Sequence, residues 1–256
     1  MECSHRREIE PPGRLRWDRA TTAWVHRFFV DAAPAERAVL TGDRARQIAT
    51  VLRLQPGQSI VLVTDRTEFD VVLQAVAPKL VSGRVVERRP VSTEPRFRFT
   101  LGLPLLKGDH SDEVVEAVTQ LGVTRIVPFI SARSVVRELS AARLDRWRRI
   151  AREAAETAHR GALPDIESLV TWEALFDRLD GETIVCWEEA ERPHLLDVAF
   201  RVALSVVIGP EGGLTPEEIE LARGRGATIA SLGRRKLRAE TAAMAAVAAV
   251  MGAHDR

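Results

Sequence analysis

The sequence predicts an α/β protein built from a small β-barrel, residues 26–92, and a larger α/β domain, residues 93–256. Three observations support this division. Short β-branched runs separated by turn residues fill the first part. Two prolines and no apolar pattern mark a linker at residues 88–95. Beyond it, strand-like runs alternate with helical patterns, which is typical of a parallel sheet.

The first part has the spacing of strands joined by turns. Residues 1–25 are rich in Arg, Glu and Pro and predict a mobile tail. A helical turn is expected within the strands, around residues 44–52. Small barrels of this kind often bind nucleic acid, so this part is a candidate RNA-binding domain. The expected strands are residues 25–30, 59–63, 70–76 and 80–87.

The second part changes from strand to helical periodicity several times. Its expected strands are residues 97–103, 125–130, 183–187, 204–208 and 227–232. Its expected helices are residues 111–121, 140–159, 215–225 and 239–251. The last helix is rich in alanine and apolar nearly all round, which predicts burial on more than one side. Packing in its own core and packing against a second subunit both remain open.

Composition excludes several classes of protein. Lys+Arg 37 against Asp+Glu 36 gives a net charge of +1, so any basic surface is local. Cys3 and Cys186 lie far apart, which argues against a disulfide framework or a zinc site. The six histidines show no ligand spacing, and we expect no metal. With no signal peptide and no run long enough to span a bilayer, we expect a cytoplasmic protein.

A glycine-rich turn follows the most apolar strand. Residues 204–208 read as a buried strand, and residues 209–214 have the sequence Gly-Pro-Glu-Gly-Gly-Leu. Thr215 is placed to cap the next helix, with Pro216 at its first position and Glu218 completing a capping box. Ligands bind at the carboxyl ends of strands in open α/β sheets. An ordinary tight turn is the alternative.

Common nucleotide-binding and hydrolase motifs are absent. No G-x-G-x-x-G follows a strand, and no G-x-x-x-x-G-K-[ST] occurs. G-x-S-x-G and H-E-x-x-H are missing as well. A dinucleotide fold, a P-loop NTPase and the usual hydrolases are therefore disfavoured.

Four segments together resemble one family. They are residues 103–109 (Leu-Pro-Leu-Leu-Lys-Gly-Asp), 153–164, 208–213 (Ile-Gly-Pro-Glu-Gly-Gly) and 232–241, which contains Leu-Arg-Ala-Glu-Thr. The set resembles the SPOUT-class methyltransferases, specifically the ribosomal RNA small subunit methyltransferase E family. The resemblance runs from about residue 25 to the end and is strongest beyond residue 200.

The resemblance implies a fold and a reaction. The fold would be a PUA-like N-terminal barrel followed by an α/β domain with a deep trefoil knot. The protein would be a homodimer with S-adenosylmethionine pockets at the subunit interface. The implied reaction is methyl transfer to N3 of a uridine in 16S ribosomal RNA of the small subunit, without a metal.

The resemblance also assigns cofactor contacts. Backbone groups on glycine-rich turns suit the adenine and ribose of S-adenosylmethionine, and Leu103 and Pro104 would add an apolar wall. The expected cofactor residues are Leu103, Pro104, Ile208, Gly209, Gly212, Gly213, Leu232, Gly233, Leu237 and Thr241.

Four charged residues are candidates for catalysis. Uridine N3–H is weakly acidic, so methylation needs positioning and a base or cation that favours the uridine anion. Arg238 and Arg160 would hold RNA phosphate or the uracil oxygens. Glu240 would orient an arginine, and Glu211 is a candidate base or cofactor contact. A structural ion pair or helix cap is the alternative for each.

Local basic clusters fit an RNA substrate. Arg234, Arg235, Lys236 and Arg238 form one cluster. The long helix carries a second group of arginines, for which exposure to solvent is favoured over contact with RNA phosphate. They are Arg143, Arg146, Arg148, Arg149 and Arg152. The sequence departs from the family pattern at Ala117, Gln120, Thr157 and His159, which leaves the RNA contacts and the target nucleotide open.

Two further functions remain open. A SPOUT-type methyltransferase could act on a different nucleotide of ribosomal or transfer RNA. A non-catalytic RNA-binding protein of ribosome assembly could keep the same fold, although the intact glycine loops at residues 209–213 and 232–241 argue for binding of the methyl donor.

Overall fold

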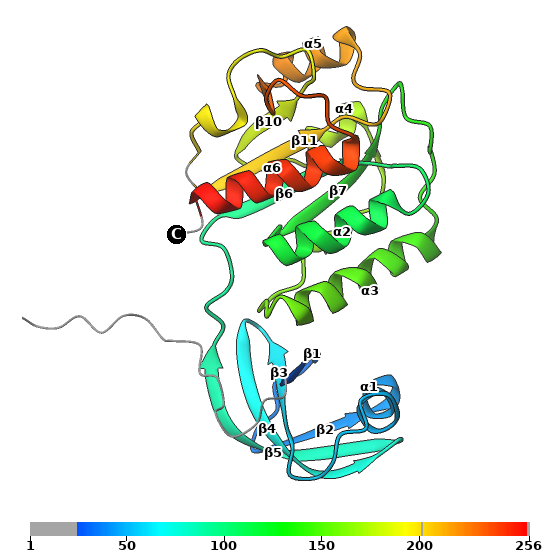
Figure 1. Cartoon of the computed structure of the whole chain (residues 1–256), viewed down its shortest axis with the longest axis vertical. Coiled ribbons are helices and arrows are strands. Elements are labelled where there is room, and N and C mark those ends of the chain that lie inside the picture. The colour runs from blue at the N-terminus through cyan, green and yellow to red at the C-terminus, as the bar shows by residue number, and fades with distance from the viewer. Residues whose placement is uncertain (1–24, 201, 255–256) are drawn as a thin grey trace, which may run out of the picture.

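The computed structural model describes residues 25–200 and 202–254. The predicted N-terminal tail, apart from Val25, lies outside the described residues. Two parts are seen, each with its own sheet (Figure 1). No helix in the described part of the chain is long and apolar enough to cross a membrane.

The first part is an open, curved five-stranded sheet with the order β1-β3-β4-β5-β2. Only β1 and β3 pair in parallel; the other pairs are antiparallel. Two register shifts bend β4 against β5. The sheet keeps two edge strands and is therefore a half-barrel, less closed than the barrel expected. Its strands are β1 His26–Phe29, β2 Arg37–Thr41, β3 Ser59–Thr64, β4 Thr67–Ala77 and β5 Leu80–Pro90.

A short helix covers the concave face of this sheet. α1 Gly42–Arg46 continues into the π-helical turn η1 Gln47–Val51, which confirms the helical turn expected around residues 44–52. Ala45 and Ile48 are fully buried against the strands. They join a core that includes Phe28, Leu62 and Phe69.

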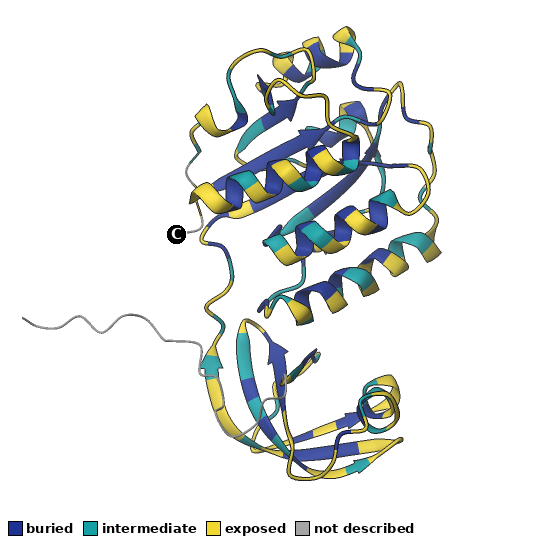
Figure 2. Cartoon of the chain, viewed as in Figure 1, coloured by how far each residue is buried: buried dark blue, intermediate teal, exposed yellow. Residues whose placement is uncertain are grey.

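The second part is a parallel sheet with the order β12-β10-β11-β6-β7-β8, and β9 also pairs with β7. Its central strands are nearly continuous apolar runs because both faces are covered. Figure 2 shows these strands as the buried centre. The strands are β6 Arg98–Pro104, β7 Arg125–Ile130, β8 Asp165–Ile166, β9 Val170–Thr171, β10 Glu182–Cys186, β11 Ala203–Ile208 and β12 Thr228–Ala230.

Helices cover both faces of the parallel sheet. α2, α3 and α6 pack over the main core, while α4 and α5 cover the opposite face (Figure 1). The helices are α2 His110–Leu121, α3 Ala141–Thr157, α4 Trp172–Leu175, the 3₁₀ turn η2 Leu195–Asp197, α5 Pro216–Gly224 and α6 Ala239–His254.

The helix caps confirm the predicted starts. Thr215 Oγ1 accepts the N–H of Glu218 at 3.2 Å, and Glu218 Oε2 accepts the N–H of Thr215 at 2.8 Å. Ser140 caps α3 by accepting the N–H of Arg143. These hydrogen bonds satisfy N–H groups that have no partner inside the helix.

The last helix is buried on one side only within this chain. Ala243, Ala246 and Val247 are fully buried against α2 and β11. Ala245 and Ala248 are exposed on the opposite side. The apolar character predicted for α6 is therefore accounted for by its own core on one face, and small side chains occupy the other.

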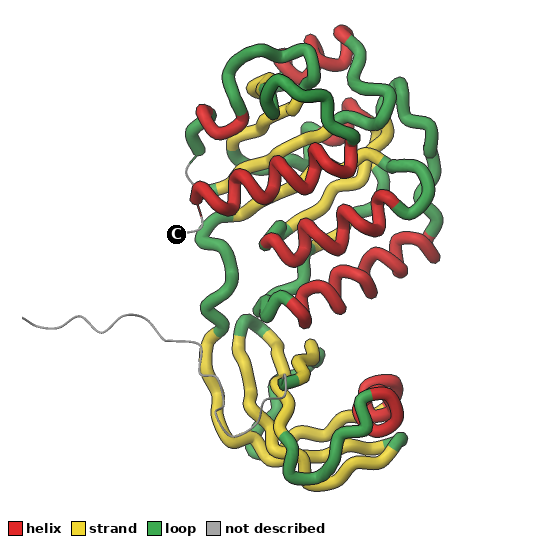
Figure 3. Tube along the Cα trace, viewed as in Figure 1, coloured by secondary structure: helices red, strands yellow, loops and turns green. Residues whose placement is uncertain are grey.

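Hydrogen bonds between distant segments join the two parts at the end of α3. Glu156 Oε1 accepts the N–H of Phe29 at 3.0 Å and an Arg44 Nη2–H at 2.6 Å. Arg27 Nη2 donates to the carbonyl oxygen of Arg160 at 2.9 Å. Figure 3 shows this end of α3 beside the strand hairpin, with the loop linker on the other side. The half-barrel therefore docks on one helix end.

Candidate active site

Three loops leave the same edge of the parallel sheet. They follow β6, β11 and β12, and all strands of this sheet run in parallel. β6 pairs directly with β11, whereas β10 stands between β11 and β12. The segments predicted to bind the cofactor are therefore brought to one edge, at the carboxyl ends of the strands.

The glycine loop after β11 is shaped by two neighbouring loops that the sequence did not single out. Gly213 has φ +72, and a Cβ there would collide with Glu188 Oε1, which follows β10. A Cβ on Gly212 would lie 2.9 Å from Cβ of Arg133, which follows β7, while Arg133 Nη1 donates to the Gly212 carbonyl at 3.1 Å. The positive φ of Gly213, and the Cβ and backbone oxygen of Arg133 beside Gly212, therefore favour glycine at both positions without any ligand.

Glu218 connects the glycine loop to the loop after β7. Its residue is only 8% exposed. One carboxylate oxygen accepts the N–H of Thr215, and the other accepts the N–H of Ala132 at 2.7 Å. The sequence identified Glu218 as a cap, but the contact with Ala132 lies 86 positions away and leaves no local signal.

Glu211 holds the first loop against the glycine loop. Its Oε1 accepts the N–H of Lys107 at 2.9 Å. The same first loop is fixed from two other sides, because Ser111 Oγ accepts the N–H of Leu106 and Arg143 Nη2 donates to the Gly108 carbonyl at 2.9 Å. One Glu211 oxygen is thus engaged with protein, which favours a positioning role.

The loop after β12 is anchored at its start and exposed beyond it. Ser231 exchanges backbone hydrogen bonds with Pro193 and Leu195. Gly233 has φ +107, and a Cβ there would meet nothing within 4 Å. The side chain of Arg238 is 83% exposed, and its Nη1 lies 4.0 Å from Glu240 Oε1.

The predicted cofactor residues divide into buried and accessible groups. Gly213 is buried within the glycine loop. Leu103, Pro104 and Ile208 are buried at the strand ends, and the side chains of Leu103 and Ile208 belong to the main core. Their side chains contribute to packing, so a ligand at this edge would meet their backbone. The accessible group contains Gly209, Gly212, Leu232, Gly233, Leu237 and Thr241.

Arg160 lies at the domain junction, away from the three loops. Its residue is 2% exposed. Nη1 donates to the carbonyls of Val123 and Thr119, at 2.6 and 3.1 Å, and the remaining donors bind Glu94. The structure thus places Arg160 in the structural ion pair left open as its alternative. These bonds leave its guanidinium no free face toward RNA.

The four departures from the family pattern also lie away from the loops. Ala117 and Gln120 are on the later turns of α2, and Gln120 is exposed. Thr157 and His159 are at the end of α3, where Thr93 Oγ1 donates to the His159 carbonyl at 2.5 Å. None of these four positions lies in the three loops.

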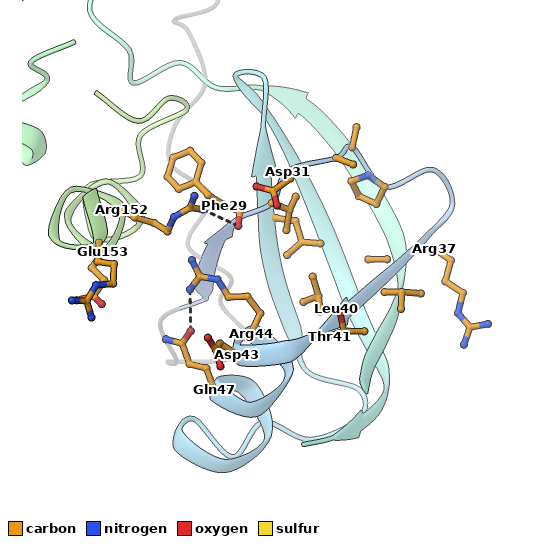
Figure 4. Close-up of a pocket in the computed structure, with 18 residues that line it drawn as sticks. Phe29, Asp31, Arg37, Leu40, Thr41, Asp43, Arg44, Gln47, Arg152 and Glu153 are labelled. Carbon is orange, nitrogen blue, oxygen red and sulfur yellow. Dashed lines mark hydrogen bonds between the residues drawn. The ribbon is translucent and has the colours of Figure 1, made fainter. Parts of the chain in front are cut away.

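A groove of about 710 Å³ lies between the half-barrel and α3 (Figure 4). Arg37 and Arg44 line it from the half-barrel, and Arg149 and Arg152 line it from α3. Arg44 is paired with Glu156, and Arg37 Nη2 donates to Ser82 Oγ at 3.2 Å. Among the described residues, no carboxylate lies within 4.0 Å of Arg149 or Arg152, so these two are the cations available to an anionic ligand.

The described residues contain no cluster of three or more His, Cys, Asp or Glu side chains able to hold a metal. Cys186 is buried, and burial raises the pKa of its thiol to about 12. A thiolate at this position is therefore disfavoured.

A family comparison decides the class of protein. Residues 93–251 match the model of the RNA methyltransferase domain. The chain belongs to the RNA methyltransferase family. Within it, the chain is 30% identical to the ribosomal RNA small subunit methyltransferase E of Bacillus subtilis over 245 residues, which cover 88% of this chain and 96% of that protein. The relative of the same name from Mycobacterium bovis is 32% identical over 239 residues, 87% of this chain and 90% of that one.

Solved structures agree with this membership. The ribosomal RNA small subunit methyltransferase E of Neisseria gonorrhoeae, bound to S-adenosylmethionine, has a TM-score of 0.83 at 27% identity. A Legionella pneumophila protein in complex with the same cofactor has a TM-score of 0.82, also at 27% identity. Each comparison covers 90% of this chain and 98% of the other. The methyltransferase fold thus extends over both parts of the chain.

Proposed function

We propose that this protein transfers the methyl group of S-adenosylmethionine to N3 of a uridine in 16S ribosomal RNA. One observation carries the proposal: in a chain of this family, the three loops after β6, β11 and β12 meet at one edge of the sheet. Such an edge is where open α/β sheets bind ligands. The proposed substrate also favours a cytoplasmic location.

The three loops offer backbone groups that could bind the methyl donor. Gly233 combines a positive φ with open space where a side chain would stand, and Gly209 begins the turn after β11. Backbone N–H and C=O groups there would hold the adenine and ribose, with Leu232, Leu237 and Thr241 at the rim. S-adenosylmethionine supplies an electrophilic methyl group when bound.

Arg238 is the residue we assign to the RNA. Its guanidinium extends into solvent from the loop that follows β12, with Glu240 at 4.0 Å as its nearest acidic partner. A free guanidinium beside the uracil oxygens would favour the N3 anion that attacks the methyl group. Glu240 would orient Arg238, and Glu211 would hold the two cofactor loops together.

We also propose that two copies complete the site. The exposed face of α6 carries the small side chains of Ala245 and Ala248, which permit close packing of a second helix. Thr241, at the start of the same face, would place the cofactor beside the partner subunit. A knotted path of the last segment, which the resemblance implies, is part of the same proposal.

The half-barrel is proposed to be a PUA-like RNA-binding domain. Its groove against α3 has a size suited to part of an RNA strand. Arg149 and Arg152 would face the phosphates, and Arg152 Nη1 lies 3.5 Å from the Phe29 carbonyl (Figure 4). The groove would give these α3 arginines a role beyond a solvated face.

Methyl transfer from labelled S-adenosylmethionine tests the proposal. The substrates are small subunits and naked 16S RNA from cells lacking the activity. Label recovered as N3-methyluridine at one site is the expected result. Label on another nucleotide or on transfer RNA would reassign the target. No label and no binding of the methyl donor would leave a non-catalytic RNA-binding protein.

A further inference from the structure

A second cavity, of about 310 Å³, lies at the opposite edge of the parallel sheet from the three loops. Arg98 and Arg125 line it from the first residues of β6 and β7. Arg96 lines it from the segment between β5 and β6, and Arg66 from the turn between β3 and β4. Both parts of the chain thus contribute cations to one hollow.

Two of these four arginines have their charge offset by acids. Arg125 Nε donates to Glu167 Oε1 at 2.5 Å. Asp180, which also lines the cavity, lies 3.5 Å from Arg125 Nη1 and 3.9 Å from Arg98 Nε. These contacts fix the acidic side of the cavity and hold Arg125 in place.

Arg66 and Arg96, unlike the other two arginines, have no acidic partner among the described residues. Within residues 25–200 and 202–254, neither side chain has a carboxylate oxygen within 4.0 Å, although Asp165 lines the same cavity. Both residues are exposed. Their guanidinium donors therefore stay available to an anion that enters the cavity.

The backbone of Arg66 gives independent support. Asp65 and Arg66 form the two-residue hairpin turn with φ +47 and +57, a conformation that favours glycine at the second position. The turn is also fixed, because Arg66 N–H donates to the Gly161 carbonyl at 3.2 Å and its carbonyl accepts the N–H of Val91 at 2.8 Å. The backbone that carries the Arg66 side chain is therefore held in place beside the cavity.

We propose that this cavity binds a phosphate group of the RNA backbone through Arg66 and Arg96. The planar guanidinium fork matches two phosphate oxygens at once. The strands separating the cavity from the three loops are six or seven residues long, so the bound phosphate lies roughly 20 Å from the methyl-transfer edge. The identity of the anion as RNA rests on the proposed function.

The turn supplies a substitution that removes only the cation. Arg66→Gly should keep the turn, because glycine prefers this backbone conformation. Arg53 is a matched control: it is also exposed, has φ +53, and lies outside the cavity. Arg53→Gly makes the same chemical change at a similar backbone conformation. Thermal unfolding checks that both variants fold like the wild type.

Binding of a labelled 24-nucleotide single-stranded RNA to the full chain is measured by fluorescence anisotropy at several salt concentrations. Arg66→Gly is expected to weaken binding several-fold and to lower the salt slope by about one ion. Arg96→Gln should act in the same direction, and Arg53→Gly should bind like the wild type. Equal affinities and slopes for Arg66→Gly and Arg53→Gly would overturn the proposal.

Two controls separate the possible sources of the anion and of failure. Inorganic phosphate that stabilises the wild type but not Arg66→Gly, with RNA binding unchanged, would assign the cavity to a free anion and overturn the RNA assignment. Calorimetry of S-adenosylmethionine binding and methyl transfer by the wild type test the proposed function separately. A chain that binds RNA through Arg66 but transfers no methyl group would refute that function alone.

Discussion

Glu94 and Arg160 form a buried ion pair between the linker and the end of α3. Arg160 Nη2 donates to Glu94 Oε2 at 2.9 Å, and Arg160 Nε donates to Glu94 Oε1 at 3.3 Å. The side chain of Arg160 is only 2% exposed and that of Glu94 only 6%. Glu94 also accepts the N–H of Gly161 at 2.8 Å. The carboxylate therefore ties the start of the second domain to the helix on which the half-barrel docks.

Loss of this carboxylate should destabilise the protein strongly. Glu94→Gln would leave the Arg160 cation buried without a counter-charge, which costs about 3–5 kcal/mol. Chemical denaturation at pH 7 measures the effect. Glu156→Gln is the control, since an amide oxygen can still accept the N–H of Phe29, and we expect a change of about 1 kcal/mol or less. Equal losses for both variants would contradict the importance of the charge on Glu94.

The two carboxyl groups should also respond oppositely to pH. Burial alone would raise the pKa of Glu94, but the hydrogen bonds and charge of Arg160 outweigh it, and the pKa is lowered. Burial raises the pKa of Glu156 despite its bond to Phe29 and the charge of Arg44. Glu94 thus stabilises the fold above its ordinary pKa of 4.5 and loses this contribution as the pH falls through its lower folded value.

Glu156 contributes in the other direction, because its folded pKa lies above the ordinary value. Its contribution is complete below pH 4.5 and is lost as the pH rises through the folded pKa. Unfolding free energies of the wild type, Glu94→Gln and Glu156→Gln, measured from pH 7 to well below pH 4.5, should show both contributions. Glu94→Gln should lose less stability on acidification than the wild type, and Glu156→Gln should lose more.

Arg238→Ala should reduce methyl transfer without affecting folding. The side chain is 83% exposed, so the free energy of unfolding should change by about 0.5 kcal/mol or less. Loss of a cation that stabilises the uridine anion should lower kcat about 10²–10³-fold. Arg235→Ala removes an exposed arginine from the same loop and is the matched control. Equal kcat losses would reduce Arg238 to one of several RNA-binding charges.

Glu211→Gln separates positioning from base catalysis. The amide oxygen of glutamine can accept the Lys107 N–H that Glu211 accepts now. If Glu211 only holds the two loops together, the variant should keep methyl transfer within about threefold, whereas loss of a general base costs about 10²–10⁴-fold. Glu211→Ala should weaken binding of S-adenosylmethionine in calorimetry, since it releases the first loop.

The glycines of the two later loops should differ in their tolerance of a side chain. Gly233→Ala meets open space and carries only the backbone cost of a positive φ, about 1–2 kcal/mol. Gly213→Ala carries the same backbone cost and also displaces the exposed Glu188 carboxylate, for a total of about 1–3 kcal/mol. Thermal unfolding compares the two. Glu188→Ala in the Gly213→Ala background should restore part of the stability, and no restoration would exclude the collision as the cause.

Sequence patterns predicted the elements that have local signals. The cap at Thr215 and the helix after it follow from residues within one turn of each other, and both are confirmed. β2 was missed because only Ala38 and Leu40 face the core while Val39 is exposed, a pattern too short to stand out. The predicted linker began inside β5 because Arg89 binds Asp70 across the sheet, a pairing that local composition does not show.

In the candidate site, too, the residues within local motifs were predictable, whereas those that act through distant contacts were not. The loops at residues 209–213 and 232–241 carry their own motifs, and the topology brings both to one edge. Arg160 lies in a motif of which only the two ends persist, and its role depends on Glu94, 66 positions away. Arg133 and Glu188, from other loops, lie where side chains on Gly212 and Gly213 would stand, and they belong to no motif. Long-range contacts of this kind become visible only in the folded chain.

The bridging carboxylate of Glu218 has a consequence for local opening. Because its two oxygens hold the N–H groups of Thr215 and Ala132, the first turn of α5 cannot fray without releasing the loop after β7. The two segments therefore form one cooperative unit on the time scale of amide exchange. A ligand seated on the glycine loop would slow solvent exchange at Ala132 without touching it.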